Sequence, residues 1–161
     1  MADEGLTQQC KVMLEIKQTK DTGDFETCAL LMSQSAPWTI LQRGYEKCMQ
    51  SLEGDFKEVY TVTYNNQFAG FVVLQMVGSF KGYIQTICIK PEHRSKGLGS
   101  AVLAFCEERI FKVSRNVFMC VSSFNERAMQ LYVKRGYEKV GDLKDFLIKG
   151  HSEFLLRKTI D

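Results

Sequence analysis

Three consecutive segments with a period of two constrain the fold of this chain more than any other feature. They read KEVYTVTY (57–64), FAGFVVLQMV (68–77) and GYIQTICIK (82–90), and Asn65 and Asn66 separate the first two. Alternating apolar residues around an Asn turn indicate a β-hairpin, and the third segment supplies a strand beside it. The centre of the chain is therefore predicted to form an antiparallel sheet.

Helical and extended patterns flank these strands on both sides. The other predicted elements are a strand at 11–19, two short helices within 24–52 separated at Pro37, a helix that follows Pro91, a buried strand at 116–123, a helix at 126–135, and two strands within 137–158 that turn at Lys149, Gly150 and His151. In the helix after Pro91, apolar residues from Leu98 to Phe105 have core-facing spacing, and Arg109 marks the exposed end of this stripe. Asn125 is the expected N-cap of the next helix, and Gly136 ends it.

The composition narrows the class of protein. The 161 residues are 45% apolar and 25% charged, and no repeat or linker interrupts them, so one α+β domain spanning residues 1–161 is predicted. A net charge of +2 is too small to predict a nucleic-acid partner. The longest apolar stretch, FAGFVVLQMVG, is about half of what a membrane-spanning helix needs. With an acidic N-terminus that lacks a signal-peptide core, these features predict a cytoplasmic protein without a membrane partner.

The cysteines show no pattern of a metal site or of a disulfide framework. Cys10, Cys28, Cys48, Cys88, Cys106 and Cys120 lie far apart, without a C-x-x-C pair or a nearby His at zinc-finger spacing. We expect reduced, mostly buried thiols and no bound metal.

A basic glycine turn, HRSKGLGS (93–100), leads directly from the third strand into the following helix. The start of a helix leaves backbone N–H groups without partners and carries a partial positive charge. Gly97 and Gly99 would let an anion approach this backbone closely, and Arg94 and Lys96 add positive charge. The turn is therefore a candidate site for a phosphate or pyrophosphate, although such a stretch taken alone can also be a plain connection.

Two motifs together carry a family resemblance. RSKGLG, from Arg94 to Gly99, matches R/Q-x-x-G-x-G/A, and the later stretch NERAMQLYVKRGY, from Asn125 to Tyr137, matches N-x-x-A-x-x-x-Y-x-x-x-G-F/Y. In this order the motifs resemble those of the GNAT superfamily of acetyl-CoA-dependent N-acetyltransferases. The resemblance implies an α+β fold with a mixed, mostly antiparallel sheet of about six to seven strands, about four flanking helices, and a V-shaped split between the fourth and fifth strands.

The resemblance also implies acetyl-CoA as co-substrate, with no metal, and places its binding residues. The backbone of Ile87, Cys88 and Ile89 would bind the pantetheine arm, as an added strand does at an open sheet edge. The pyrophosphate would be bound by the amides of Arg94, Ser95, Lys96, Gly97, Leu98, Gly99 and Ser100. Asn125 would cap its helix and also contact the arm. Lys134 and Arg135 would either meet the adenosine phosphates or simply be cations favoured at a helix C-terminus.

Acyl transfer to an amine needs an acid for the leaving thiolate and a base for the amine. By resemblance, Tyr132 is the candidate acid, since a phenol with a pKa of about 10 is protonated at neutral pH; its alternative role is packing on the sheet. Many members of the superfamily have a Glu where Gln85 stands here, and Gln85 cannot accept a proton. The possible substitutes are Tyr83, Asp145, His151 and an ordered water, and the residues single out none of them. His93 is expected near the phosphates rather than near the amine, and Cys88 is expected to be a buried strand residue rather than a nucleophile.

The acceptor is predicted to be a small-molecule amine or a protein amine, either an N-terminus or a lysine. It would be bound by residues 24–55 and by the terminal strands. Trp38 and Tyr45 of this region either line the acceptor pocket or belong to the core, the commoner role. The alternative to an active enzyme is a CoA-binding regulatory module that does not catalyse, which Gln85 favours; a weaker third idea is a domain for another phosphorylated ligand, such as a nucleotide. An exposed edge of the terminal strands would support a homodimer.

Overall fold

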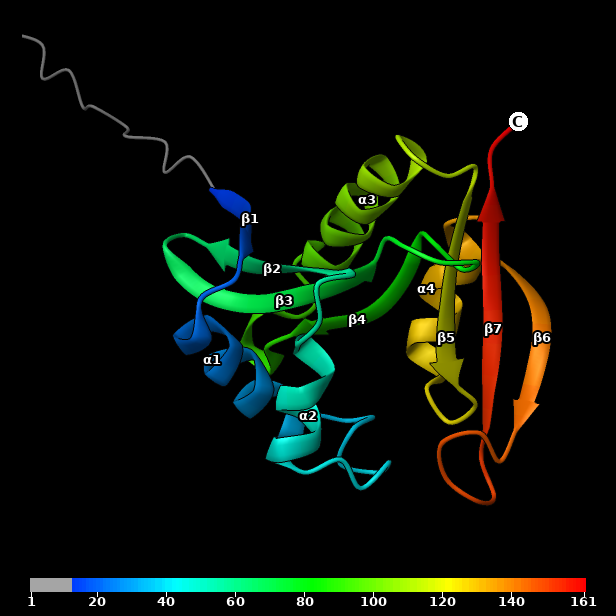
Figure 1. Cartoon of the computed structure of the whole chain (residues 1–161), viewed down its shortest axis with the longest axis horizontal. Coiled ribbons are helices and arrows are strands. Elements are labelled where there is room, and N and C mark those ends of the chain that lie inside the picture. Colours follow the sequence, from blue (N-terminus) through cyan, green and yellow to red (C-terminus); the bar gives the residue numbers. More distant parts are fainter. Residues whose placement is uncertain (1–12) are drawn as a thin grey trace, which may run out of the picture.

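The computed structural model describes residues 13–161, and one seven-stranded sheet runs through them (Figure 1). The strands are β1 (Leu14–Thr19), β2 (Lys57–Tyr64), β3 (Gln67–Gln75), β4 (Tyr83–Ile89), β5 (Asn116–Ser122), β6 (Glu138–Lys144) and β7 (Ser152–Thr159). Their order in the sheet is β1-β2-β3-β4-β5-β7-β6. All neighbouring pairs are antiparallel except β4 and β5, which are parallel. The predicted α+β class with a mixed, mostly antiparallel sheet is confirmed.

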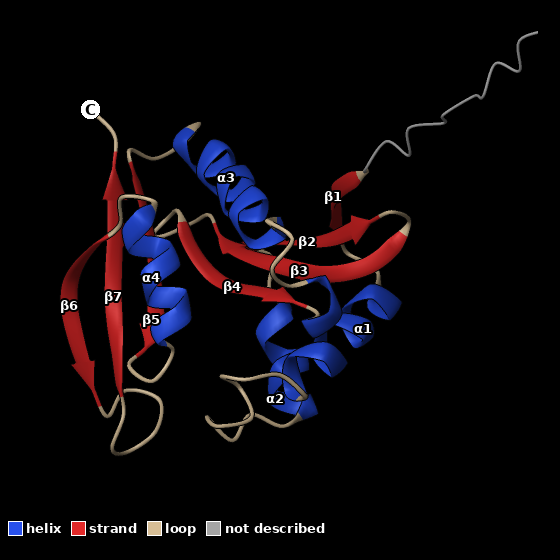
Figure 2. Cartoon of the chain, turned by 180° about the vertical axis from the view of Figure 1, so that it is seen from behind, coloured by secondary structure: helices blue, strands red, loops and turns tan. Residues whose placement is uncertain are grey.

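Helices cover both faces of the sheet. The α-helices within residues 13–161 are α1 (Thr22–Ser33), α2 (Tyr45–Leu52), α3 (Leu98–Phe111) and α4 (Glu126–Lys134), and a short 3-10 turn, Pro91–His93, precedes α3. Figure 2 shows α1 and α2 on one side of β2, β3 and β4, and α3 on the other. None of the helices in the described part of the chain has the length and apolar character needed to cross a bilayer.

The strand β3 is apolar without interruption because both of its faces are covered. Phe71 and Val73 pack with α1 and α2, whereas Val72 and Leu74 pack in the larger cluster under α3. A strand buried on both faces has no solvent side on which polar residues would alternate. The period of two expected for 68–77 is therefore replaced by a continuous apolar run from Phe68 to Leu74.

The sheet splits between β4 and β5. Their parallel ladder has only two pairs, Tyr83 with Phe118 and Ile84 with Met119, whereas β4 continues to pair with β3 as far as Ile89. The half formed by β5, β7 and β6 therefore diverges from the half formed by β1 to β4, as Figure 1 shows. This confirms the predicted V-shaped split between the fourth and fifth strands.

Among the boundaries that differ from the sequence prediction are those of the first strand, of α1 and of the connection between β6 and β7. The first strand begins at Leu14, with residues 11 and 12 of the predicted range outside the described residues, and α1 begins at Thr22 because Asp21 Oδ1 accepts a hydrogen bond from the Asp24 amide at 3.0 Å. The connection between β6 and β7 is a loop over 145–151, not a turn at 149–151. Asp145 ends β6 with a φ of 52°, and its carboxylate accepts a hydrogen bond from the Gly150 amide across the loop.

Two predictions about single side chains are also resolved by the packing. The Arg109 guanidinium is not the free end of a stripe, because it binds both carboxylate oxygens of Glu58. The cysteines within the described residues are free thiols, and Cys28, Cys48, Cys88 and Cys106 are buried. Cys10 lies outside the described residues.

Candidate functional site

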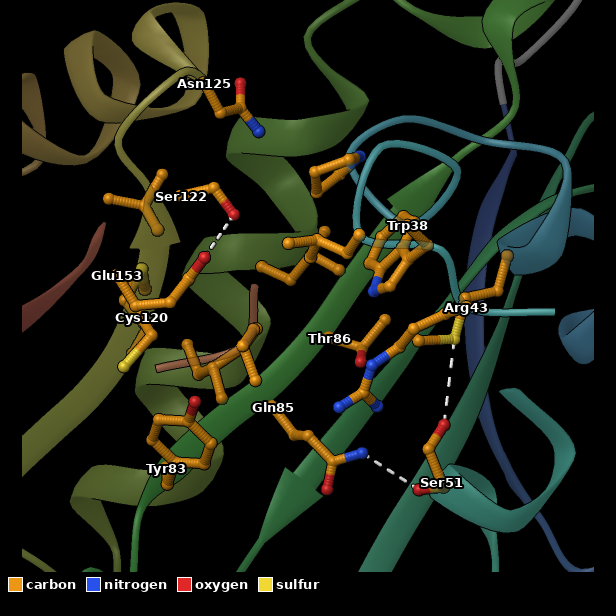
Figure 3. Close-up of a pocket in the computed structure, with 18 of the residues that line it drawn as sticks. Trp38, Arg43, Ser51, Tyr83, Gln85, Thr86, Cys120, Ser122, Asn125 and Glu153 are labelled. Carbon is orange, nitrogen blue, oxygen red and sulfur yellow. Dashed lines mark hydrogen bonds between the residues drawn. The ribbon is translucent and has the colours of Figure 1, made fainter. Parts of the chain in front are cut away.

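A pocket of about 730 Å³ opens where β4 and β5 separate (Figure 3). Strands β4, β5 and β7 form one part of its wall, and the start of α4 forms another. The loop between α1 and α2 closes the opposite side with Pro37, Trp38, Leu41 and Arg43. Strands that diverge in the middle of a sheet thus leave a cavity between the first half of the chain and its C-terminal strands.

The backbone of β4 is open toward this cavity. Within the described residues, the strand has no partner on the β5 side beyond Ile84, and Thr86 to Ile89 pair with β3 alone. Gln85 is the extra residue of a bulge, because Val73 pairs with Thr86 and Leu74 with Ile84. Ile87, Cys88 and Ile89 therefore lie where an extended ligand could add itself to the sheet edge.

The Cys88 side chain is not suited to act as a nucleophile. It is 2% exposed and packs in the cluster beneath α1 and α2. Burial raises the pKa of this thiol to about 12, an effect that the nearby Ser35 and Arg94 only partly oppose. At neutral pH the thiol is protonated, so it is a core side chain, as the sequence predicted.

The glycine turn before α3 presents a row of free amides. No acceptor among residues 13–161 receives a hydrogen bond from the backbone N–H groups of Ser95 to Ser100, and Ala101 is the first to bond back into the turn, to Gly97. Gly97 has a φ of 78°, and a Cβ built on it would meet no atom within 4 Å. Six consecutive unpaired amides at the start of a 14-residue helix form a row of donors suited to an anion.

The basic side chains around this turn each have a contact partner in the protein. Arg94 Nε donates to the Ile89 carbonyl at 2.9 Å, which ties the turn to the end of β4. Lys96 Nζ lies 5.7 Å from the ring centre of Tyr64, and Arg127 of α4 donates to the Ser95 hydroxyl. His93 is 7% exposed with its ring edge-on to Tyr64, so it supports the turn from within.

Helix α4 brings three motif residues to the pocket. The Asn125 side chain accepts from the Ala128 amide at 3.3 Å, which confirms the predicted N-cap, and both residues line the pocket. Tyr132 lines it one turn further on, with its ring edge-on to Tyr137 at 6.0 Å. Burial, together with the nearby Cys106, raises the pKa of Tyr132 to about 12. The phenol is therefore a proton donor throughout the neutral range.

The two cations at the end of α4 have different surroundings. Arg135 donates to Glu107 of α3 at 2.9 Å, and Lys158 of β7 binds the same carboxylate. Arg135 is thus occupied in joining α4 to α3. Lys134 is exposed and forms no salt bridge within residues 13–161, so it stays available for a ligand phosphate.

Gln85 holds the pocket wall together. Its Oε1 accepts from Gln75 at 2.8 Å, and its Nε2 donates to the Ser51 carbonyl at 2.9 Å at the end of α2. An amide that is bonded at both ends links the β4 bulge to α2. It has no free group with which to take up a proton.

The three side chains considered as substitutes for the missing base are either neutral or outside the pocket lining. Burial raises the pKa of Tyr83 far above its ordinary value, so this phenol is neutral although it lines the pocket. Asp145 and His151 both lie in the loop between β6 and β7, outside the residues that line the pocket. Asp145 accepts from the Gly150 amide, and the His151 ring packs edge-on against Phe124.

A carboxylate that the sequence analysis missed does line the pocket. Glu153 of β7 is 5% exposed, and its Oε1 accepts a hydrogen bond from the Ser122 hydroxyl of β5 (Figure 3). Burial raises the pKa of Glu153, while the Ser122 hydrogen bond and the charge of Arg43 act in the opposite direction. The signal in the sequence was a single acidic residue inside the strand pattern SEFLLRK.

The two aromatic residues of the α1–α2 region separate. Trp38 lines the pocket and also packs against the core cluster beneath α1 and α2. Tyr45 is 41% exposed and does not line the pocket, so the prediction that it belongs to the core was wrong. Tyr45 is the first residue of α2, and the helix buries its opposite face through Cys48 and Leu52. Residues 13–161 contain no cluster of three or more His, Cys, Asp or Glu side chains that could hold a metal ion.

Known proteins share this fold. A family model described as the acetyltransferase (GNAT) family matches residues 25–137. The ribosomal-protein-S18-alanine N-acetyltransferase from Escherichia coli has a TM-score of 0.75 at 18% identity, covering 92% of this chain and 95% of that one. Spermidine N-acetyltransferase from Vibrio cholerae, solved in complex with CoA and spermine, has a TM-score of 0.71 at 15% identity, covering 91% of this chain and 95% of that one.

Proposed function

Since the chain belongs to the acetyltransferase (GNAT) family and is an acetyltransferase, we propose that it moves the acetyl group of acetyl-CoA to a primary amine. Acyl transfer of this kind proceeds by direct attack of the amine on the thioester carbonyl, through a tetrahedral intermediate. We further propose that residues 1–161 form one acetyltransferase domain. The solved relatives named above are N-acetyltransferases of a ribosomal-protein alanine and of spermidine, and this supports an amine as acceptor.

The observation that carries this proposal is the row of free amides from Ser95 to Ser100. A pyrophosphate has several acceptor oxygens and two negative charges, which match a donor row at the positive end of a helix. The residues proposed to bind it are Arg94, Ser95, Lys96, Gly97, Leu98, Gly99 and Ser100. Lys134 is proposed to bind a further phosphate of the same ligand.

The pantetheine arm is proposed to lie along the unpaired edge of β4. Its amide groups would pair with the backbone of Ile87, Cys88 and Ile89, which lacks a strand partner on the β5 side. Asn125 stands at the mouth of the split and would contact the same arm. This placement puts the thioester end of the cofactor in the pocket between β4 and α4.

Tyr132 is proposed to act as the acid. Tyr132 lines the pocket, and with a pKa of about 12 its hydroxyl would keep its proton until the thiolate leaves. A thiol has an ordinary pKa near 8.5, so in water a phenol would not readily give its proton to a thiolate. Inside the buried site the thiolate is poorly solvated, which raises the pKa of the thiol and makes transfer of the proton from the phenol to the sulfur favourable. General acid catalysis of this type contributes about 10²- to 10⁴-fold to a rate.

The proposal is tested with the purified full chain, acetyl-CoA and a panel of amines. Acetyl transfer predicts that free thiol is released only when an amine is present, and that an acetylated amine appears in equal amount. A regulatory module would instead bind acetyl-CoA in calorimetry and release no thiol with any amine or peptide. Competition of nucleotides with acetyl-CoA would select the third function, a site for another phosphorylated ligand.

A further inference from the structure

The charged side chains of the pocket are unevenly distributed. Three of them are cationic, namely Arg43, Lys47 and Lys57, and the only acid among the lining residues is Glu153. Glu153 is buried at the β7 wall, and only one of its two oxygens, Oε1, has a hydrogen-bond donor within residues 13–161. Its second oxygen is therefore available to a ligand inside the pocket.

Arg43 reaches into the same space from the opposite wall. Its backbone is fixed, since its amide donates to the Trp38 carbonyl at 3.0 Å and its carbonyl accepts from the Cys48 thiol. Its guanidinium points into the cavity toward the side where Glu153 lies (Figure 3). No acid among residues 13–161 forms a salt bridge with it, so the guanidinium has no counter-ion from the described part of the chain.

We propose that the acceptor is a small amine that also carries a carboxylate, with Glu153 facing the amine and Arg43 binding the carboxylate. This inference rests on the proposed acetyl transfer and names the class of its acceptor. A guanidinium offers two parallel N–H donors that match a carboxylate. The opposite charges on the two walls therefore complement a zwitterion such as an amino acid.

The balance of charge argues against a polycation in this pocket. A polyamine would bring several positive charges beside Arg43, Lys47 and Lys57, and like charges in a confined site cost free energy. One carboxylate on the acceptor converts this repulsion into attraction. The apolar wall residues Trp38, Leu41, Phe146 and Leu147 additionally favour an acceptor with an apolar side chain.

The chemical step uses both ends of the site. The bound ammonium first loses one proton to water. The nitrogen of the resulting neutral amine then forms a bond to the carbonyl carbon, and the C–S bond of the thioester breaks. One proton passes from that nitrogen to the Glu153 carboxylate, and the departing sulfur takes a proton from the Tyr132 hydroxyl. Glu153 then loses its proton to water and Tyr132 regains one, which restores the site. Neither an oxidant nor a further co-reactant is needed.

The surroundings of Glu153 strengthen its carboxylate as a base. Burial raises the pKa of its carboxyl, which brings its basicity closer to that of the amine it serves. The titratable groups that face it are Tyr83 of β4, Cys120 of β5 and Arg43, and burial raises the pKa of both Tyr83 and Cys120, so these two are neutral at pH 7. Opposite it on β6 stands Leu143.

The test compares matched acceptors that differ only in the carboxylate. Suitable pairs are phenylalanine with phenethylamine, leucine with leucinamide, and 4-aminobutyrate with butylamine, and spermidine serves as a polycation. The proposal predicts a kcat/KM about 10- to 100-fold higher for at least one carboxylate-bearing member than for its partner, the range expected of one charge-assisted hydrogen-bonded pair. Spermidine is expected to be the poorest acceptor.

Arg43 variants then locate the carboxylate. Arg43→Gln should remove the preference within each pair by lowering kcat/KM only for the carboxylate-bearing member, and Arg43→Lys should retain part of it. Arg115→Gln, an exposed arginine outside the pocket, is the matched control and should leave the preference unchanged. Acetyl-CoA affinity in calorimetry should be the same in all of these proteins.

Glu153 variants test the base through the pH profile. Glu153→Gln should lower kcat about 100-fold with both members of a pair and remove the acidic limb of the profile, and Glu153→Asp should restore part of the rate. Equal activity toward both members of every pair, or equal loss of both in Arg43→Gln, would overturn the assignment of the acceptor while leaving acetyl transfer intact. Absence of turnover with every amine, together with unchanged acetyl-CoA binding, would overturn the proposed function itself.

Discussion

At the scale of single residues, the pocket combines a phenol that keeps its proton with a carboxylate that is costly to ionise. Both side chains owe this to burial, which penalises the charged form of an acid. Tyr132 is buried by α3 and the sheet, and Glu153 by β5 and β7. Burial therefore gives each group a protonation behaviour different from its behaviour in water.

Replacing Tyr132 by Phe should separate turnover from cofactor binding. The variant keeps the ring that packs against Tyr137 and loses only the hydroxyl, so kcat should fall about 100-fold while acetyl-CoA affinity changes little. Steady-state kinetics and calorimetry measure the two quantities. Tyr45→Phe, which removes an exposed hydroxyl outside the pocket, is the control; an unchanged kcat in Tyr132→Phe would remove this residue from the mechanism.

Replacing Glu153 by Gln should stabilise the protein at neutral pH. Because burial raises the pKa of Glu153 above its unfolded value near 4.3, the ionised carboxylate costs free energy in the folded state. This cost is absent below the unfolded pKa and develops as the pH rises through the folded pKa. Urea unfolding at several pH values should show Glu153→Gln gaining stability over the parent protein with rising pH. A constant difference at all pH values would contradict this origin of the effect.

At the scale of elements, the start of α3 offers a ligand mainly backbone amides rather than side chains. Its six amides are free because they precede the first hydrogen bonds of the helix, and Gly97 among them takes a left-handed conformation, with a φ of 78°, that other residues adopt at a cost of about 1–2 kcal/mol. Gly99, inside the first turn of the helix, has no such constraint. The two glycines of the motif therefore have different physical roles.

Alanine substitutions at three glycines should reveal this difference. Gly78 has a φ of 90° and, like Gly97, open space around a built Cβ, but it lies in the loop between β3 and β4. Gly97→Ala and Gly78→Ala should both lose about 1–2 kcal/mol of unfolding free energy, and of these two variants Gly97→Ala alone should lose acetyl-CoA affinity. Gly99→Ala should keep its stability, because its Cβ would make an ordinary contact of 3.8 Å with Leu131, and should still weaken binding.

The carboxylate of Glu107 joins three elements beneath the split. Arg135, the C-cap of α4, and Lys158 of β7 each bind it at 2.9 Å, and Glu107 is 6% exposed. Removing one partner of a buried ion pair costs up to about 3–5 kcal/mol, and the partial exposure of both cations places the expected cost of Glu107→Ala nearer 2 kcal/mol. Urea unfolding should show this loss, whereas Glu108→Ala, on the exposed side of α3, should change stability by less than about 0.5 kcal/mol.

At the scale of the whole molecule, the sequence predicted best those elements and binding residues that are specified by a few neighbouring positions. The strands 57–64 and 82–90, the glycine turn and the α4 motif were all recognisable because turn residues and periodicity act over a few positions. Glu153 could not be found in this way. It becomes a pocket residue only because β7 is inserted between β5 and β6, far from β4 in the sequence. The bonded state of Gln85 likewise depends on Gln75 and Ser51, which no local pattern connects to it.

Because the ladder between β4 and β5 has two residue pairs, the stability of the fold is linked to the binding of the proposed co-substrate, acetyl-CoA. Any molecule that bridges the two strands beyond Met119 completes hydrogen bonds that the polypeptide itself leaves open. By mass action, such a ligand at 100 times its Kd adds about 2.7 kcal/mol to the unfolding free energy. The stability of the split sheet therefore depends on the concentration of acetyl-CoA. The lifetime of the folded chain against proteolysis should rise and fall with that concentration.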